Sequence, residues 1–250
     1  MEMKILYAGD SPVGGPANYL LGVLRSLKAS VVHVPPVKKL RPVLFRQKYD
    51  AFLLSDFSRK NVPQASEKAI VEQVKRGAGL MMVGGWGSFS GPFGHWRGSL
   101  VEKILPVQCL SRDDRLNFPG GAFIVEKEKH PMFRGIRFNH PPVICGLNQV
   151  RPKKSNLVIL TARRVFWSPL PQWGRGLGEG KEYPLLVIDR DPQKRIAALT
   201  TDLAPHWCGG LVDWGRRRMS LRVKDKIQIE TGDLYVRFVS SLLKWLARKG

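Results

Sequence analysis

Cysteine is scarce in this chain of 250 residues, which contains three: Cys109, Cys145 and Cys208. An odd and sparse set without a Cys-x-x-Cys spacing argues against a disulfide framework and against a cysteine-based zinc site. We therefore interpret all three as free thiols that are buried like small apolar side chains.

The sequence also lacks a long apolar run and a secretory leader. No apolar stretch approaches the roughly 20 residues that a bilayer-spanning helix requires. The first ten residues resemble a strand and contain no apolar segment typical of a signal peptide. With 43% apolar residues, the chain can still fill a core. These features predict a cytoplasmic, folded protein without a membrane partner.

Acidic residues are few: 20 Asp and Glu stand against 41 Lys and Arg, a net charge of +21. A surface of this charge attracts nucleic acid, anionic lipid or acidic metabolites. No recognised nucleic-acid motif accompanies the charge, so a nucleic-acid partner is not the expected one. For the same reason we interpret the densest basic run, residues 216–226, as a solvated loop. Nucleic-acid binding through the basic surface is kept as an alternative function, which predicts binding that weakens steeply with salt.

Strands and helices alternate in the first 90 residues. Short apolar runs predict strands, and apolar residues at helical spacing predict helices after Pro16 and across 64–76. The expected strands cover residues 4–8, 30–34, 50–56 and 80–83. This order is typical of a doubly wound α/β domain with a parallel sheet.

The second half is less regular and suggests β-strands added to that sheet. Residues 164–181, with Trp167 and Trp173, form a long loop that we expect to be mobile or folded over a site. A helix is expected from Thr231 or Asp233 to about Arg248. Because no repeat or linker is visible, we expect one domain across 1–250. Further strands are expected at 122–125, 142–145, 156–160, 183–189 and 195–200.

A glycine-rich turn follows the expected strand at 80–83. Gly84, Gly85 and Gly87 allow a sharp turn and close approach of another group. In a parallel sheet, ligands bind at the carboxyl ends of the strands, so this turn is the expected binding place. The backbone amides of Gly85, Trp86 and Gly87 could receive an anion or a carbonyl oxygen there.

Five stretches in this order resemble the class I glutamine amidotransferase-like superfamily, and in particular its "putative glutamine amidotransferase" branch, related to trehalose-utilisation-type proteins. The resemblance covers nearly the whole chain and implies a flavodoxin-like, three-layer α/β sandwich with a mostly parallel sheet and extra strands in the second half. The stretches are residues 50–56, 77–89, 130–135, 201–207 and the Trp-Leu pair in the final helix.

The same resemblance implies a degenerate catalytic triad. Active members carry a nucleophilic cysteine in a Gly-x-Cys-x-Gly turn, a histidine that activates it, and a glutamate two residues after that histidine. Here the cysteine position is Gly85, the histidine position is His206, and the glutamate position is Cys208. Glycine cannot form an acyl-enzyme, so we do not expect hydrolysis of glutamine by this mechanism.

Two residues remain as catalytic candidates. His206 could act as a base or bind a ligand near neutral pH, or could simply be hydrogen-bonded in a loop. Ser88 is the hydroxyl nearest the turn, but it is not in a Gly-x-Ser-x-Gly pattern, and a turn-stabilising role is favoured. A hydrolase acting on a carbohydrate-like or amide substrate through His206 is the alternative to simple ligand binding.

Asp10 and Asp56 each end an expected strand at the same edge of the sheet. They could orient a ligand hydroxyl or bind a metal together with His206, or each could close an Asx turn, which is the favoured role. With Gly84, Gly85, Trp86 and Gly87 they complete the expected ligand site. Histidines lack the spacing of a metal site, so we expect neither metal nor cofactor. An unknown small molecule is the expected partner, and the sequence leaves self-association open.

Overall fold

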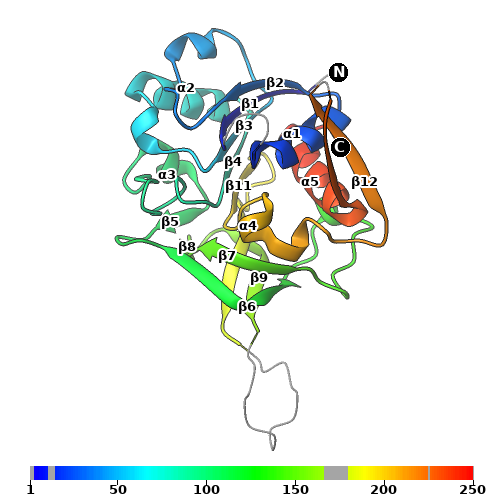
Figure 1. Ribbon diagram of the computed structural model, residues 1–250. Helices are drawn as coiled ribbons and strands as arrows, with labels where there is room; N and C mark the ends of the chain where they lie inside the picture. The colour runs from blue at the N-terminus through cyan, green and yellow to red at the C-terminus, as the bar shows by residue number, and fades with distance from the viewer. Residues whose placement is uncertain (1–2, 11–14, 166–179, 225, 250) are drawn as a thin grey trace, which may run out of the picture.

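A nine-stranded mixed sheet runs through the structure, a computed structural model that describes residues 3–10, 15–165, 180–224 and 226–249 (Figure 1). Its strand order is β2-β1-β3-β4-β11-β10-β9-β6-β7. Five strands are mutually parallel: β1 (Lys4–Gly9), β2 (Ser30–Val34), β3 (Ala51–Ser55), β4 (Gly79–Val83) and β11 (Ile196–Leu199). Four extend the sheet in antiparallel fashion: β6 (Arg115–Glu126), β7 (Val143–Asn148), β9 (Leu157–Arg164) and β10 (Glu182–Ile188).

Helices cover both faces of the parallel half, as expected for an α/β fold. In Figure 1, α1 and α5 lie on one side of these strands, and α2 and α3 lie on the other. The helices are α1 (Ala17–Ser26), α2 (Gln64–Lys75), α3 (Leu100–Ile104), α4 (Pro205–Cys208) and α5 (Asp233–Leu246). Two small antiparallel pairs lie outside the nine-stranded sheet: β5 (Val107–Cys109) with β8 (Val150–Pro152), and β12 (Arg218–Lys224) with β13 (Ile227–Gly232).

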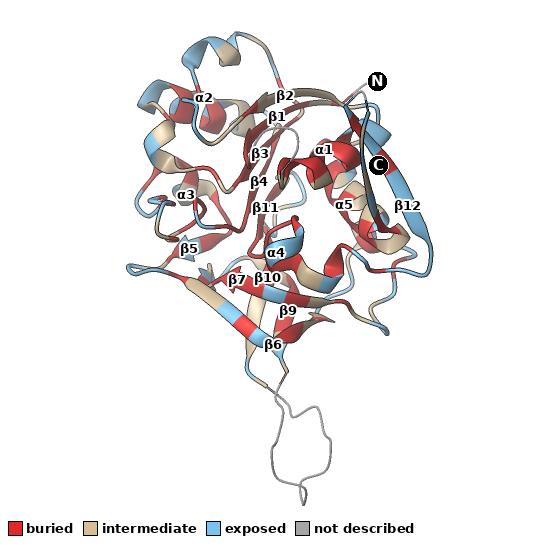
Figure 2. Cartoon of the chain, in the orientation of Figure 1, coloured by how far each residue is buried: buried red, intermediate tan, exposed pale blue. Residues whose placement is uncertain are grey.

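The core divides into two clusters, one on each face of the sheet. In β1, Ile5 and Tyr7 join the cluster beneath α1 and α5, while Leu6 and Ala8 join the cluster beneath α2. Successive side chains of a strand point to opposite faces, so a strand covered on both sides is apolar throughout. Figure 2 shows the resulting band of buried residues along these strands.

The basic run at 216–226 is not the loop that the sequence suggested. Residues 218–224 form β12, in which Leu221 and Val223 are buried while Arg222 and Lys224 are exposed. Its inner face packs closely on α1, because a Cβ added to Gly22 would lie 3.2 Å from the Leu221 Cβ. The alternation of cationic and apolar residues indicated a half-buried strand, and the high charge obscured it.

Two other expectations end differently. Residues 166–179, including Trp167 and Trp173, lie outside the described residues. The last helix begins after Gly232, and neither Thr231 nor Asp233 caps it with its side chain. Asp233 Oδ1 instead accepts hydrogen bonds from the Arg216 and Arg217 amides. Among the described residues, no helix is both long and apolar enough to span a bilayer.

Candidate functional site

Three aspartates follow strands of the parallel sheet at one edge. Asp10 comes directly after β1 and Asp56 directly after β3, and Asp202 follows the end of β11. The register of β1 and β3 pairs Gly9 with Ser55, so the first two aspartates leave the sheet at the same level. The carboxyl edge of the parallel strands therefore gathers acidic side chains in an otherwise basic protein.

The glycine-rich turn leaves this edge next to Asp56 and has no room for a side chain at its centre. Gly85 has φ +153°, and a Cβ built on it would lie 2.7–2.8 Å from the carboxylate and Cβ atoms of Asp56. A Cβ on Gly84 would lie 2.0 Å from the Thr200 carbonyl oxygen. The backbone of the turn therefore packs directly against Asp56 and Thr200, at the position where the resemblance places a nucleophile.

The amides of this turn already have partners inside the protein. The Gly85 N–H donates to Asn148 Oδ1 at 2.9 Å, and the Gly87 N–H donates to the Asp56 carboxylate. Burial raises the pKa of Asp56. Hydrogen bonds from the Gly87 and Trp86 amides favour the charged carboxylate and oppose this rise. The anion site expected from these amides is therefore filled, in this structure, by the protein's own carboxylate and amide oxygens.

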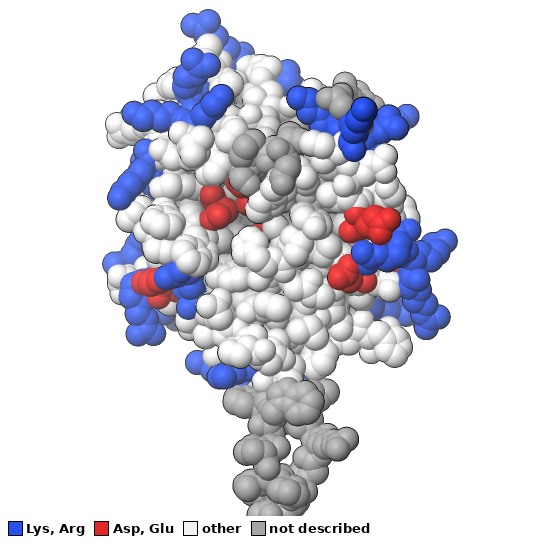
Figure 3. All heavy atoms as spheres, viewed as in Figure 1, with Lys and Arg blue, Asp and Glu red and all other residues white. Residues whose placement is uncertain are grey.

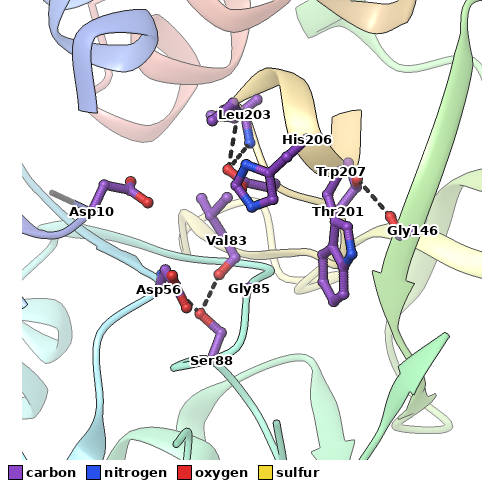
Figure 4. Close-up of polar contacts among 12 residues, drawn as sticks. Asp10, Asp56, Val83, Gly85, Ser88, Gly146, Thr201, Leu203, His206 and Trp207 are labelled. Atoms are coloured by element: carbon purple, nitrogen blue, oxygen red, sulfur yellow. Dashed lines mark hydrogen bonds and ion pairs between the residues drawn. The ribbon is translucent and has the colours of Figure 1, made fainter. Parts of the chain in front are cut away.

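Ser88 is buried and fully engaged in holding the turn. Its hydroxyl donates to the Val83 carbonyl at 2.5 Å and accepts from the Asp56 N–H at 3.0 Å (Figure 4). Ser88 is only 1% exposed to solvent. This geometry is that of a turn-stabilising serine, whose hydroxyl proton is already donated to a backbone carbonyl.

Replacing Ser88 with alanine should lower the free energy of unfolding by about 1–3 kcal/mol, because the buried Val83 carbonyl loses its donor and the Asp56 amide loses its acceptor. Chemical denaturation of Ser88→Ala measures this, with Ser155→Ala as the control at an exposed serine. Equal stability of the two variants would contradict the structural role.

The side chains of His206 and Asp202 lie next to each other at this edge of the sheet. The Nε2 atom of His206 lies 3.1 Å from Asp202 Oδ2; the His206 side chain is 53% exposed and that of Asp202 is 2% exposed. The other oxygen, Oδ1, accepts from the Leu203 and Ala204 amides at 2.5 and 2.9 Å. Burial raises the pKa of Asp202 to about 7, against the opposing effect of the Ala204 amide. An exposed imidazole therefore lies beside a buried carboxyl group that holds its proton more tightly than an exposed aspartate does.

Asp10 completes the acidic cluster from β1. It accepts a hydrogen bond from the buried Tyr7 hydroxyl. Burial raises the pKa of Asp10 well above its usual value, and the nearby carboxylates of Asp202 and Asp56 raise it further. Figure 4 shows Asp10, Asp56 and His206 around the same side of the turn. Two of the predicted residues, Asp10 and Asp56, are thus brought together with predicted His206.

A second buried carboxylate supports the turn from the opposite side and was missed by sequence reasoning. Asp114 Oδ1 accepts from Asn148 Nδ2 at 2.6 Å, and Oδ2 accepts from the Ser90 N–H at 2.7 Å. Asn148 Nδ2 also donates to the Gly85 carbonyl at 3.2 Å. Burial raises the pKa of Asp114 to about 6. Asp114 lies between turn-like residues, which gave no signal of this role; Asp202 had one, since it follows an apolar strand as Asp10 and Asp56 do.

Trp86 projects from the turn and is 46% exposed. The Arg115 guanidinium lies 4.3 Å from its ring centroid, and the Phe93 ring stacks against it at 6.3 Å. Trp207, by contrast, is buried, and its Nε1 donates to Asn117 Oδ1 at 3.0 Å. Of these two tryptophans, Trp86 is therefore the one with ring surface available to a ligand.

Within the described ranges, no three His, Cys, Asp or Glu side chains are grouped so that they could hold a metal ion. The three cysteines are free; Cys109 and Cys208 are buried, and Cys145 is exposed. The interpretation of Cys145 as a buried thiol is therefore wrong: it lies at an outward-facing position of β7.

Comparisons with known proteins agree with this fold. The "Putative glutamine amidotransferase" (GATase1-like) family matches residues 17–227. Cytoplasmic Protein STM3548 from Salmonella typhimurium has a TM-score of 0.65 at 24% identity, over 82% of this chain and 90% of that one. Cytoplasmic Protein STM1381 from Salmonella typhimurium LT2 has a TM-score of 0.64 at 24% identity, over 83% and 91%.

A ThuA-like protein from Parabacteroides merdae ATCC 43184 is similar at a TM-score of 0.61 and 12% identity, over 99% of this chain and 90% of that chain. No match was found among curated proteins. The structural likenesses show a shared α/β fold. The family match covers most of the sequence, and the chain therefore belongs to the GATase1-like, "Putative glutamine amidotransferase", family.

Proposed function

We propose that this chain binds a small polar ligand at the carboxyl edge of its sheet and does not hydrolyse glutamine through a nucleophile on the glycine-rich turn. The observation that carries the proposal is the packing of Gly85, whose missing Cβ would collide with Asp56. Covalent amide hydrolysis needs an activated nucleophile at hydrogen-bonding distance from its base. The turn supplies neither a side chain at Gly85 nor a free hydroxyl at Ser88.

The chemistry of the site indicates the class of ligand. Asp10, Asp56 and Asp202 place carboxyl oxygens around His206, and each carboxyl has a pKa raised by burial. Such a cluster accepts hydrogen bonds and repels anions. The ligand we infer is neutral or cationic and rich in hydroxyl or amine donors, with Trp86 available to stack on an apolar face. A cytoplasmic location, which the names of the two Salmonella proteins state for them, is part of this proposal.

A second candidate is hydrolysis by a water molecule rather than by a protein nucleophile. The position of His206 favours it, because this exposed imidazole lies 3.1 Å from the Asp202 carboxyl group and a histidine next to a carboxyl group can serve as a general base. This activity would use the same crevice and the same polar substrates. It differs from simple binding in one measurable respect: His206→Ala would then abolish turnover of a substrate that still binds.

A thermal-shift screen followed by calorimetry tests the proposal on the full chain. The panel contains L-glutamine, simple amides, amines, polyols, mono- and disaccharides, with acetate as an anionic comparison. A hit at the site should lose about tenfold or more in affinity in His206→Ala, the size of one hydrogen bond to a charged group. His140→Ala, at an exposed histidine outside the cluster, is the matched control and should bind normally.

Glutamine hydrolysis is measured on the same preparations. Steady turnover by a variant lacking all three cysteines would contradict our account of the turn, as would a set of hits that bind equally well to His206→Ala and Asp56→Asn. Turnover of another panel compound that His206→Ala abolishes would select the second candidate.

A further inference from the structure

A groove of about 1100 Å³ opens on the α2–α3 side of the molecule, apart from the carboxylate cluster. Its walls come from four segments: the loop at residues 95–98, helix α3, the β5–β8 pair and the loop at residues 110–112. None of the residues of the carboxylate cluster lines it. The groove is a separate feature, and the functional site does not account for it.

Four cationic side chains surround this groove without a counter-ion. Arg97, Lys103, Arg112 and Arg151 are all exposed. Within the described part of the chain, none of their side chains makes an ion pair or a hydrogen bond that would neutralise it. Like charges held together in this way repel one another, and a bound anion would relieve that repulsion.

The backbone fixes where these cations lie. Gln108 of β5 pairs directly with Arg151 of β8, so both side chains leave the outer face of the small sheet. Their neighbours Val107, Cys109 and Val150 are buried on the inner face. Because side chains along a strand point alternately to the two faces of the sheet, Arg151 lies on the outer face, which borders the groove.

A lysine holds α3 against this sheet. Lys153 Nζ donates to the carbonyl oxygens of Glu102, Lys103 and Leu105 at 3.0, 2.9 and 2.6 Å. These carbonyls lie at and just after the C-terminal end of the helix, where the last turn leaves carbonyl groups short of N–H donors. Lys153 is thus a structural cation, whereas the other four remain available to a ligand.

Glu102, the one acidic residue among the described lining residues, is also committed to the framework. Its Oε1 accepts from the Cys109 N–H at 2.7 Å, and its Oε2 accepts from the Gly98 N–H. The carboxylate therefore connects the loop at residues 95–98 to the last residue of β5. Its charge is partly satisfied by these amides, which leaves the groove with a clear cationic excess.

We propose that this basic groove binds a small molecule carrying two or more phosphate groups. Arginine guanidinium groups match phosphate oxygens in bidentate fashion, and three of the four free cations are arginines. Cations on separate walls can contact separate phosphates of one ligand. The groove has the size of a small-molecule site.

Two observations favour a small ligand over a nucleic acid. The lining contains no Phe, Tyr or Trp on which bases could stack, and His95 is its single aromatic ring among the described residues. In addition, Figure 3 shows Lys and Arg in separate groups around the edges of the viewed face, with an acidic group nearer its centre, rather than as a continuous track. A single strand bound through its backbone would need such a track.

Calorimetry with inorganic tripolyphosphate tests the proposal on the full chain at about 150 mM salt, where diffuse surface attraction is largely screened. We expect saturable binding that raises the melting temperature. The double variant Arg112→Ala/Arg151→Ala should bind at least about tenfold more weakly, because it removes two charge-assisted contacts. Its melting temperature without ligand should be unchanged, since both side chains are exposed and unpaired.

The double variant Arg41→Ala/Arg46→Ala is the matched control: it removes the same charge at two exposed arginines outside the groove. It should bind tripolyphosphate within about twofold of wild type if contact geometry matters more than net charge. Equal weakening in both double variants would overturn the proposal, and so would absent binding. Tighter binding of a single-stranded oligonucleotide that competes with tripolyphosphate would also overturn it. His206→Ala should retain tripolyphosphate binding, so failure here and failure of the proposed function are separable.

Discussion

Replacing Gly85 with cysteine should destabilise the protein by at least about 3 kcal/mol and should leave glutamine hydrolysis at background. The backbone at φ +153° is one that side chains rarely adopt, a strain of roughly 1–3 kcal/mol. The new Cβ would also lie 2.7 Å from Asp56 Oδ1, so Asp56 must move and its hydrogen bond with the Gly87 amide is lost. That hydrogen bond adds about 1 kcal/mol or more.

Gly77→Cys separates backbone strain from collision. Gly77 also has positive φ, +107°, but nothing lies within 4 Å of a Cβ built there. Chemical denaturation should therefore show a clearly smaller loss for Gly77→Cys than for Gly85→Cys. Adding Asp56→Gly to Gly85→Cys should recover part of the loss, because it removes both the carboxylate and the Cβ that the new side chain would meet. Full stability of Gly85→Cys, or cysteine-dependent glutamine turnover by it, would show that the turn retains room for a nucleophile.

Replacing Asp202 with asparagine should stabilise the protein at pH 8 by about 2 kcal/mol or more while having little effect near pH 4. The folded-state pKa of Asp202 is raised to about 7, well above the value of about 4 for an exposed aspartate. Between these values the folded chain holds a proton that the unfolded chain has released. The free energy of unfolding therefore falls as the pH rises from about 4 to about 7, because folding must retain this proton or bury a charge. Above pH 7 the destabilisation by ionised Asp202 stays constant.

Asparagine has no such titration and preserves the shape of the side chain. Its Oδ1 can still accept from the Leu203 and Ala204 amides, as the aspartate does. Each pKa unit corresponds to about 1.4 kcal/mol, so a shift of this size corresponds to roughly 4 kcal/mol. We expect less because Asp10 and Asp56 interact with Asp202 and share the titration.

Urea denaturation of wild type and Asp202→Asn at pH 4, 6 and 8 measures this effect. Asp213→Asn is the control, since the Asp213 side chain is 65% exposed and forms its ion pair with Arg218 at the surface. The stability difference between Asp213→Asn and wild type should vary little over this range. A difference for Asp202→Asn that is independent of pH, or that favours wild type at pH 8, would contradict the assignment.

A gain in stability from Asp202→Asn would have a functional meaning. Natural proteins retain unfavourable buried charges where activity requires them, so stabilising substitutions there often impair function. The same variant should therefore lose affinity for the ligand that His206→Ala loses. Stability and binding would then change in opposite directions at one residue.

Sequence reasoning located the candidate site because its residues follow strand ends. Asp10, Asp56 and the glycine-rich turn each come directly after an apolar run, and parallel strands bring such positions to one edge. His206 was placed by resemblance rather than by pattern. Asp114 and Asn148 could not be found in this way, because they are distant in sequence from the turn and contact it only through tertiary packing.

The sequence by itself determined the α/β class, the alternation of strands and helices in the first 90 residues, and the absence of a side chain at position 85. These follow from apolar periodicity and residue identity, which are local properties. Only the tertiary structure decided that Asp56 occupies the turn's amides, that Ser88 is engaged, and that Arg151 joins three other cations at one groove. Those outcomes depend on distances between segments far apart in the chain, and strand register and packing set those distances.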